Sequence, residues 1–265
     1  MIISILLLLG LSFGSFVNAF VWRLHEHKDW VKERSICPHC KHELAATDLV
    51  PVLSWLWLRG KCRYCHKPIS LQYPLVEIAT ALLFIGSYIF WPEPLHGLRT
   101  VIFALWLVLL VGLVALLVYD LRWMLLPNRV IFPLLVVASA QALARVISSA
   151  DPAHTLLGVV LGALVGGGVF YLLFQVSGGK WIGGGDVKLG FLLGIIVATP
   201  AKSVLVIFLA SVLGTFISLP LLMSKKLKAK SQIPFGPFLI VAAIVVVLFG
   251  SDILHWYTHD ILLLG

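Results

Sequence analysis

The sequence predicts an all-α protein that crosses a membrane several times and carries one small polar insertion near its N-terminus. Of the 265 residues, 60% are hydrophobic and only 12% are charged, and the mean hydropathy is +1.02. Apolar runs of about 17 to 25 residues recur along the chain, and each is long enough to cross a hydrocarbon core of about 30 Å as a helix. Soluble domains have a different balance, so we expect a lipid bilayer to be the main solvent.

About eight apolar runs are expected to be transmembrane helices. They cover residues 2–22, 75–91, 100–118, 130–147, 155–176, 187–199, 203–223 and 233–250, and the sixth is shorter than the others. The first run could instead be a signal peptide, but it lacks a basic segment before its apolar stretch. We therefore divide the chain into a first transmembrane helix (1–22), a polar insertion (23–74) and a seven-helix transmembrane domain (75–265).

Basic residues predict the orientation of these helices, because Lys and Arg are retained on the cytoplasmic side. Seventeen of the 20 lie on one side, namely Arg23, Lys28, Lys32, Arg34, Lys41, Arg59, Lys61, Arg63, Lys67, Arg122, Arg129, Lys180, Lys188, Lys225, Lys226, Lys228 and Lys230. The other three are Arg99, Arg145 and Lys202. We therefore expect both termini outside and the insertion in the cytoplasm. The net charge of +8 follows from this topology and does not indicate nucleic-acid binding.

All four cysteines lie in the polar insertion, as two C-x2-C pairs. Cys37 and Cys40 form the first pair, Cys62 and Cys65 form the second, and 21 residues separate the two pairs. Such pairs can place four thiolates around a tetrahedral Zn²⁺, whereas disulfides do not persist in the cytoplasm. We expect a closed, structural zinc site. The nearby histidines that could replace one thiolate are His39, His42 and His66.

The segment between the two pairs is too apolar for a solvated linker. It contains Trp55 and Trp57, whose rings suit the headgroup region of a membrane. The same rings could instead pack on the cysteine pairs. The sequence leaves both interpretations open.

The catalytic candidates emerge from the 12 acidic residues. Most lie in polar loops, where a charge costs little. Glu77, Asp120 and Asp186 instead border or enter apolar runs at the cytoplasmic end, where an ionisable group is costly and often marks function. Asp120 could alternatively form an ion pair with Arg122 or Arg129.

Asp186 ends the run Gly183-Gly184-Gly185, whose glycines allow another backbone to approach closely. It could also simply cap the following helix. Because Asp120 and Asp186 share one membrane face, we expect a dyad in which one ionised carboxylate activates water while the other donates a proton. The sequence has no intramembrane Ser-His pair and no H-E-x-x-H motif. It therefore does not support a serine protease or a metalloprotease of the H-E-x-x-H type.

Several motifs, in order along the whole chain, resemble those of the prepilin peptidase family, also called type IV leader peptidases. They are Gly14-Ser15-Phe16-Val17-Asn18 with Arg23, the cysteine segment continuing to Glu77, Asp120 with Pro127-Asn128, the GxGD-type Gly183-Gly184-Gly185-Asp186-Val187-Lys188, and Pro234-Phe235-Gly236-Pro237-Phe238. A GxGD motif alone is also similar to presenilin-like proteases. The cysteine pairs and the last motif favour prepilin peptidases.

The resemblance implies a bacterial inner-membrane enzyme that acts on type IV prepilins or type II secretion pseudopilins at the cytoplasmic face. It would remove the basic leader that precedes the hydrophobic helix of these substrates. Asp120 and Asp186 would catalyse this cleavage, typically between Gly and Phe. It also implies N-methylation of the new N-terminus from S-adenosylmethionine. No methyl-donor motif is readable, and Glu77 with the cysteine region is a candidate for that function.

Two other functions are consistent with parts of the pattern. A proton- or cation-coupled transporter could use Asp120 and Asp186 as ligands between helices, although no inverted repeat of broken helices supports it. A zinc-stabilised assembly scaffold would not need either aspartate. The sequence does not predict the oligomeric state.

Overall fold

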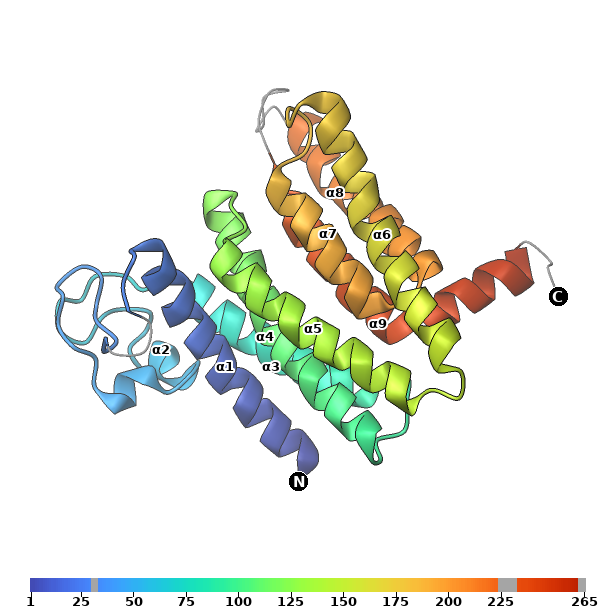
Figure 1. Ribbon diagram of the computed structural model, residues 1–265. Coiled ribbons are helices and arrows are strands. Elements are labelled where there is room, and N and C mark those ends of the chain that lie inside the picture. The colour runs from blue at the N-terminus through green and yellow to red at the C-terminus, as the bar shows by residue number, and fades with distance from the viewer. Residues whose placement is uncertain (30–32, 224–232, 262–265) are drawn as a thin grey trace. The chain divides into compact units, whose positions relative to one another are not determined.

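The protein is described here by a computed structural model, which covers residues 1–29, 33–223 and 233–261. Within these ranges the fold is all-α, as predicted, and the extended pairing consists of two isolated β-bridges. The elements, shown in Figure 1, are α1 (Ile2–His25), η1 (Ala46–Leu49), α2 (Leu53–Trp57), α3 (Gln72–Ile89), α4 (Leu98–Trp123), α5 (Asn128–Ser148), α6 (Pro152–Ser177), α7 (Gly184–Val197), α8 (Pro200–Met223), α9 (Gly236–Trp256) and η2 (Tyr257–Ile261).

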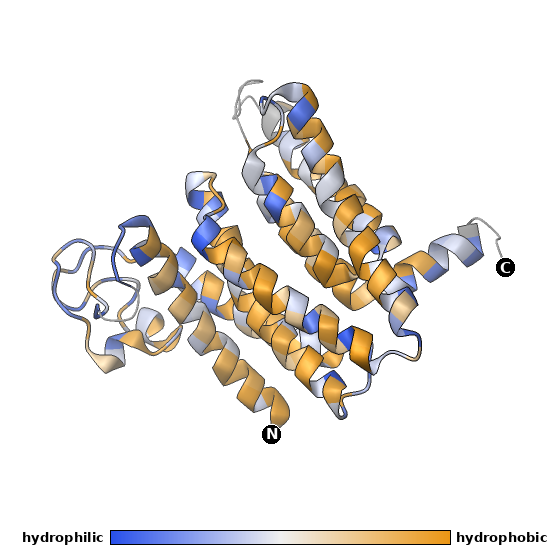
Figure 2. Ribbon diagram, in the orientation of Figure 1, coloured by the Kyte–Doolittle hydropathy of each residue, from blue (hydrophilic) through white to orange (hydrophobic). Residues whose placement is uncertain are grey.

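Seven helices in the described part of the chain are long and apolar enough to cross a membrane: α1, α3, α4, α5, α6, α8 and α9. Apolar residues run through their middle parts, as Figure 2 shows. The predicted count of eight is not confirmed, because the sixth predicted span is α7, which has only 14 residues and is therefore about 21 Å long.

Helix α7 is apolar because it is surrounded by protein. Its side chains Leu189, Leu192 and Ile196 are fully buried, and its neighbours are α5, α6, α8 and α9. A helix covered on all sides is hydrophobic all round. Sequence hydropathy alone cannot separate such a helix from a membrane span.

The chain forms two compact units, residues 1–89 with 110–115 and residues 90–109 with 116–265. In the first unit, α1 packs directly on α3 because two glycines remove side chains from the contact. A Cβ atom on Gly10 would lie 2.5 Å from Ala81 Cα, and one on Gly14 would lie 2.6 Å from Glu77 Cα. Small residues allow this close backbone approach inside membranes.

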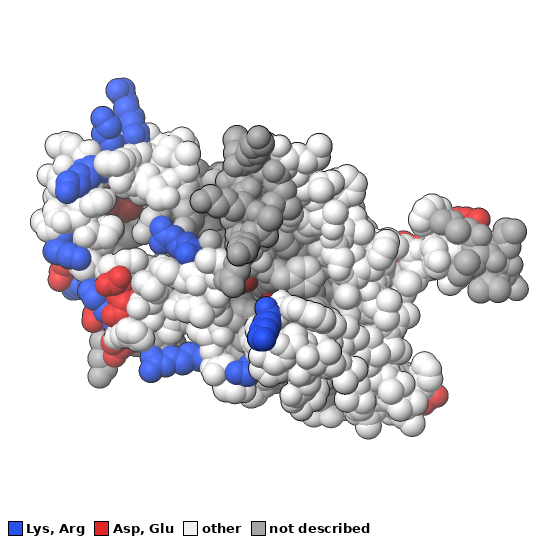
Figure 3. Space-filling view, turned by 90° about the horizontal axis from the view of Figure 1, so that it is seen from above, with Lys and Arg blue, Asp and Glu red and all other residues white. Residues whose placement is uncertain are grey.

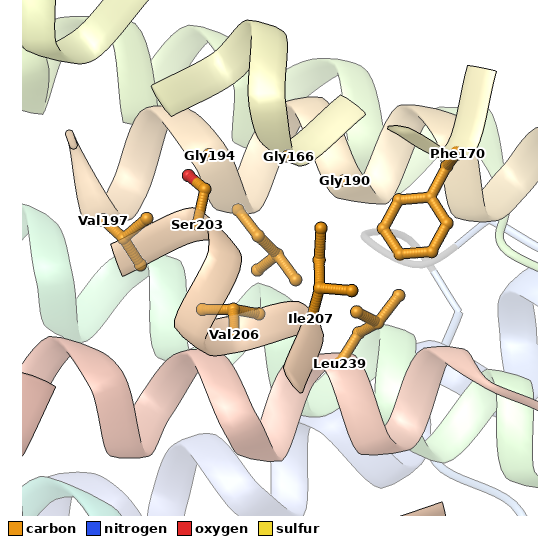
Figure 4. A pocket seen from close by; sticks show the side chains of 10 residues that line it. Gly166, Phe170, Gly190, Gly194, Val197, Ser203, Val206, Ile207 and Leu239 are labelled. Atoms are coloured by element: carbon orange, nitrogen blue, oxygen red, sulfur yellow. The ribbon is translucent and has the colours of Figure 1, made fainter. Parts of the chain in front are cut away.

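In the second unit, glycines also allow close backbone contact between α6 and α7. A Cβ atom on Gly166 would lie 2.6 Å from the Gly190 carbonyl oxygen. A cavity of about 10 Å³ lies beside this contact. Glycines and apolar residues, including Phe170 and Leu239, form most of its lining (Figure 4). The hydroxyl of Ser203, which also borders it, donates to the Gly162 carbonyl at 2.8 Å. The cavity is a packing gap that is too small for an organic ligand.

Candidate active site

Asp120 lies near the C-terminal end of α4 and is only 4% exposed. Its carboxylate accepts a hydrogen bond from the backbone N–H of Gly236, the first residue of α9. The N-terminal end of a helix favours a negative charge. No ion pair in the described part of the chain joins Asp120 to Arg122 or Arg129, so the alternative ion-pair role is not seen.

Gly236 allows α9 to approach this carboxylate. A Cβ atom at this position would collide with Oδ2 of Asp120 and would lie 3.6 Å from Cδ1 of Leu126. A side chain here would displace the carboxylate or α9. The glycine in the last motif is therefore explained by contact with Asp120, a relationship that the sequence did not predict.

Asp186 lies in the first turn of α7, where Gly183 is the N-cap residue. The backbone N–H of Asp186 donates to the Gly183 carbonyl at 3.1 Å, and its carboxylate accepts the backbone N–H of Gly183. Asp186 thus stands three residues after the cap and reaches back to it, as in half of a capping box. It supports the helix start without being the N-cap residue itself.

The two aspartates meet near Leu126, which follows Asp120 in the α4–α5 connection. A Cβ atom on Gly185, the residue before Asp186, would lie 3.1 Å from Cβ of Leu126. The carboxylates of Asp120 and Asp186 are close enough to interact electrostatically. Like charges at short range favour sharing of one proton, which is the condition for a working dyad.

The four cysteines form one cluster in the first unit. The Sγ atoms of Cys37, Cys40, Cys62 and Cys65 all lie within 4.8 Å of one another and could hold a metal ion. The predicted substitutes His39, His42 and His66 are not part of this cluster. Four thiols without acidic or histidine partners are a donor set that suits zinc.

Two similar hairpins bring the thiols together. In the first hairpin, the N–H of Lys41 donates to the Cys37 carbonyl at 2.9 Å. In the second, the N–H of His66 donates to the Cys62 carbonyl at 3.0 Å. Lys41 and His66 both adopt a positive φ, 60° and 55°, so each chain turns back in the same way.

The thiols do not ionise independently. Burial raises the pKa of Cys37. Hydrogen bonds, chiefly from the backbone N–H groups of Cys40 and His39, have a larger opposite effect and lower this pKa to about 7. The backbone N–H of Lys67 lowers the pKa of Cys65, whereas burial and the other three thiols raise it to about 11. Four thiolates this close together repel one another, and a bound cation would stabilise all four in the ionised form.

Glu77 lies in the same unit as the cysteines, on α3, and is only 6% exposed. Its Oε2 accepts the backbone N–H of Val52 at 2.7 Å, and its carboxylate also accepts the hydroxyl of Ser15. Val52 has φ 61°, a strained conformation for a β-branched residue. Glu77 therefore anchors the turn before α2. A role in methyl transfer stays a prediction.

Asn18, from the first motif, has a similar anchoring role. Its side-chain Nδ2 donates to the Tyr73 carbonyl at 3.1 Å, and its Oδ1 accepts from Nε2 of Gln72 at 3.2 Å. The connection between α1 and α3, residues 26–71, carries the four cysteines and is called the cysteine loop below. Its end, at the start of α3, is thereby fixed to α1. These contacts give Ser15 and Asn18 a structural function that sequence reasoning left open.

The two tryptophans of the loop behave differently. Trp55 Nε1 donates to the Ile69 carbonyl at 3.2 Å, and its ring lies over Gly60, so Trp55 packs on the second hairpin. Trp57 is 89% exposed, which leaves it available to a membrane interface. Each of the two interpretations thus fits one residue.

Lys and Arg side chains project from the cysteine loop, with acidic residues between them (Figure 3). Arg63 pairs with Asp48 at 2.7 Å and Arg34 pairs with Glu43 at 3.1 Å. Some of the basic residues on which the predicted orientation rests lie outside the described residues: Lys32, Lys225, Lys226, Lys228 and Lys230.

Two family models match the chain. Residues 8–91 match the bacterial peptidase A24 N-terminal domain, and residues 107–219 match the type IV leader peptidase family. The prepilin leader peptidase/N-methyltransferase of Aeromonas hydrophila is 33% identical, over 98% of this chain and 94% of its own. The chain belongs to the type IV leader peptidase family.

Other relatives with the same name extend this result. That of Bacillus subtilis is 31% identical, over 96% of this chain and 97% of its own, and that of Pseudomonas aeruginosa is 33% identical, over 95% and 91%. No solved structure matches significantly. Seven membrane-competent helices make this leader peptidase family member a multi-pass membrane protein, and nothing in the comparisons supports the transporter alternative.

Proposed function

We propose that this chain is a prepilin peptidase that removes the leader of type IV prepilins or type II secretion pseudopilins, with Asp120 and Asp186 as the catalytic pair. The observation that carries this proposal is that Leu126 contacts both Gly185, the residue before Asp186, and Gly236, which lies against the buried Asp120 carboxylate. Membership of the type IV leader peptidase family gives that pair a peptide substrate.

The chemistry needs the two carboxylates in different protonation states. One ionised carboxylate takes a proton from water, which attacks the carbonyl carbon of the scissile peptide bond, and the protonated partner donates to the carbonyl oxygen. The carboxyl group that took the proton from water then donates it to the amide nitrogen, and the other carboxylate accepts a proton from one hydroxyl of the tetrahedral intermediate. Collapse of this intermediate breaks the C–N bond, releases the new amine and returns both carboxyl groups to their starting states. Backbone N–H groups of Gly183 and Gly236 hold the carboxylates in place.

The second proposed reaction is N-methylation of the new N-terminus. The amine attacks the methyl group of S-adenosylmethionine, which leaves as S-adenosylhomocysteine, and the amine loses a proton. The names of the relatives support this reaction. Glu77 and the cysteine region are candidates for positioning its substrates, and no residue is assigned to the methyl donor.

We further propose that the four cysteines hold a structural zinc ion in a cytoplasmic domain of residues 23–74. In this arrangement both termini lie outside, in the bacterial inner membrane, and Asp120 and Asp186 face the cytoplasm. The clustering of the thiols supports the zinc site. The distribution of basic residues supports the topology.

Purified protein in detergent or lipid discs, incubated with a full-length prepilin, tests the proposal. We expect a shortened pilin whose new N-terminal residue is identified by mass spectrometry, and addition of S-adenosylmethionine should increase its mass by one methyl group. Absence of any cleavage by folded protein would contradict the peptidase function. Cleavage without methylation would contradict only the second reaction.

A further inference from the structure

A recess of about 460 Å³ lies between the C-terminal half of α8 and the start of α9, within the second unit. One face of α8 forms its first wall. The first turn of α9 and the residues just before that helix form the second wall. The α8 residues are Ser211, Gly214, Thr215, Ser218 and Leu219, and the others are Ile233, Phe235 and Phe238.

The α8 wall is made of small side chains whose polar atoms are already satisfied. The hydroxyls of Ser211, Thr215 and Ser218 each donate to the carbonyl four residues earlier, at 2.8, 2.8 and 2.5 Å. The recess therefore presents small groups and no free hydroxyl hydrogen on this wall. Small residues spaced by four, such as Gly214 and Ser218, allow a second helix to approach closely in a membrane.

One residue of the recess wall is adjacent in the chain to a residue that contacts the candidate dyad. Phe235, in the recess wall, directly precedes Gly236, whose backbone N–H binds the Asp120 carboxylate. The Phe235 ring lies 6.4 Å from the ring of Phe238 and 6.0 Å from that of Phe170. A substrate whose scissile bond lies at Asp120 thus has an apolar, aromatic-walled recess next to it.

We propose that this recess binds one face of the apolar helix of the substrate, beginning at the residues just after the cleaved bond. The inference rests on the proposed peptidase function. A segment that enters the bilayer from the cleavage site must be helical, because its backbone groups find no other partners there. A helix is about 10 to 12 Å wide, so the recess takes the side chains of a few residues while the helix lies along α8.

Crosslinking tests this placement directly. A photoreactive benzoylphenylalanine is introduced at Thr215, in the recess, or at the neighbouring Phe216, which is 73% exposed and does not line it. Both are made with Asp186→Asn, so that uncut prepilin accumulates. We expect a crosslink to the first turns of the prepilin helix from position 215 and a much lower yield from position 216. Equal yields, or crosslinks only to lipid or to this chain, would overturn the inference.

Kinetics provide a second measurement that does not depend on crosslinking. Ser218→Trp fills the recess, and Phe216→Trp adds a similar ring outside it. For folded variants we expect Ser218→Trp to raise KM for prepilin about tenfold with little change in kcat, because binding that is equal in the ground and transition states is lost. Phe216→Trp should match the unsubstituted protein.

The two proposals fail in different ways. If unsubstituted protein cleaves prepilin but Ser218→Trp behaves as Phe216→Trp, the recess does not bind the helix and the peptidase function stands. If the unsubstituted, folded protein does not cleave at all, the proposed function and the recess inference fall together.

Discussion

Lys188 Nζ donates a hydrogen bond to Oδ1 of Asn128 at 2.8 Å. Lys188 lies two residues after Asp186 in α7, and Asn128 begins α5 just after the turn that follows Asp120. The bond therefore connects the two segments that carry the aspartates. Asn128 is exposed, so water competes for this bond. We expect it to contribute about 0.5 to 1.5 kcal/mol, enough to influence how the two carboxylates are placed.

Removal of this bond should slow catalysis without unfolding the protein. We expect Lys188→Met and Asn128→Ala each to lower kcat about tenfold, which corresponds to about 1.4 kcal/mol, and the double variant to be no worse than either single one. Steady-state cleavage of prepilin measures this. Lys180→Met, an exposed lysine in the preceding loop, is the matched control. Additive losses in the double variant would mean that the two residues act separately.

The dyad predicts strong and non-additive losses. Asp120→Asn and Asp186→Asn should each nearly abolish cleavage, and the double variant should be little slower, because residues that act as a unit are not additive. Asp151→Asn is the matched control, since Asp151 caps α6 and Asn caps equally well. Near-normal cleavage by either single variant at normal expression would exclude that aspartate from the chemistry.

Glu77→Gln offers a second control for the same experiment. The amide oxygen of Gln can still accept the Val52 N–H, so the anchor to the turn is largely retained. We expect cleavage to continue in this variant. A loss as severe as that of Asp186→Asn would place Glu77 in the peptidase reaction and contradict the assignment of the pair.

Gly236→Ala tests the contact between α9 and Asp120. The added methyl group meets the Asp120 carboxylate, so we expect a loss of cleavage of about 100-fold, as for other small displacements of reacting groups. Gly168→Ala is the control, because its Cβ would meet no atom within 4 Å. Thermal unfolding should be similar for both variants. Equal activity of both would show that α9 does not position Asp120.

The sequence predicted the all-α class, the polar insertion and the clustering of the four cysteines, because each depends on local chemistry or spacing. It left the number of membrane spans unconfirmed, since α7 is apolar and surrounded by protein but is shorter than the seven helices that are long enough to span a membrane. Apolar periodicity cannot distinguish these two environments. The 14 residues of α7 were the available signal.

The supporting residues of the site were harder to predict. Leu126 carries no chemical signal, yet it lies against both glycine-bearing segments next to the aspartates. The contact of Gly236 with Asp120 joins residues 116 positions apart in the sequence, and only the packing of α9 brings them together. A motif identifies such a glycine, but three-dimensional proximity is needed to explain it.

The anchor at Glu77 predicts a local effect on the cysteine loop. Glu77→Ala removes the acceptor of the Val52 N–H and leaves a strained turn without its restraint, so the loop should become more accessible to protease. We expect faster trypsin cleavage at Arg59 and Lys61 in Glu77→Ala than in Glu77→Gln. Equal rates for the two variants would show that the carboxylate does not hold the turn.

Metal removal should loosen the cysteine loop. Zinc requires deprotonated thiolates, so protons compete with it, and occupancy should be full at neutral pH and fall as the pH is lowered. Trp55, which packs on the second hairpin, should then report the change through a red shift of its fluorescence. Elemental analysis at each pH gives the zinc content, and Trp55→Phe should remove most of the shift.

Cys40→Ser should release zinc at a higher pH than the unsubstituted protein, because a three-thiolate site binds more weakly. Fresh protein without zinc and with the loop still folded would contradict the structural role of the metal.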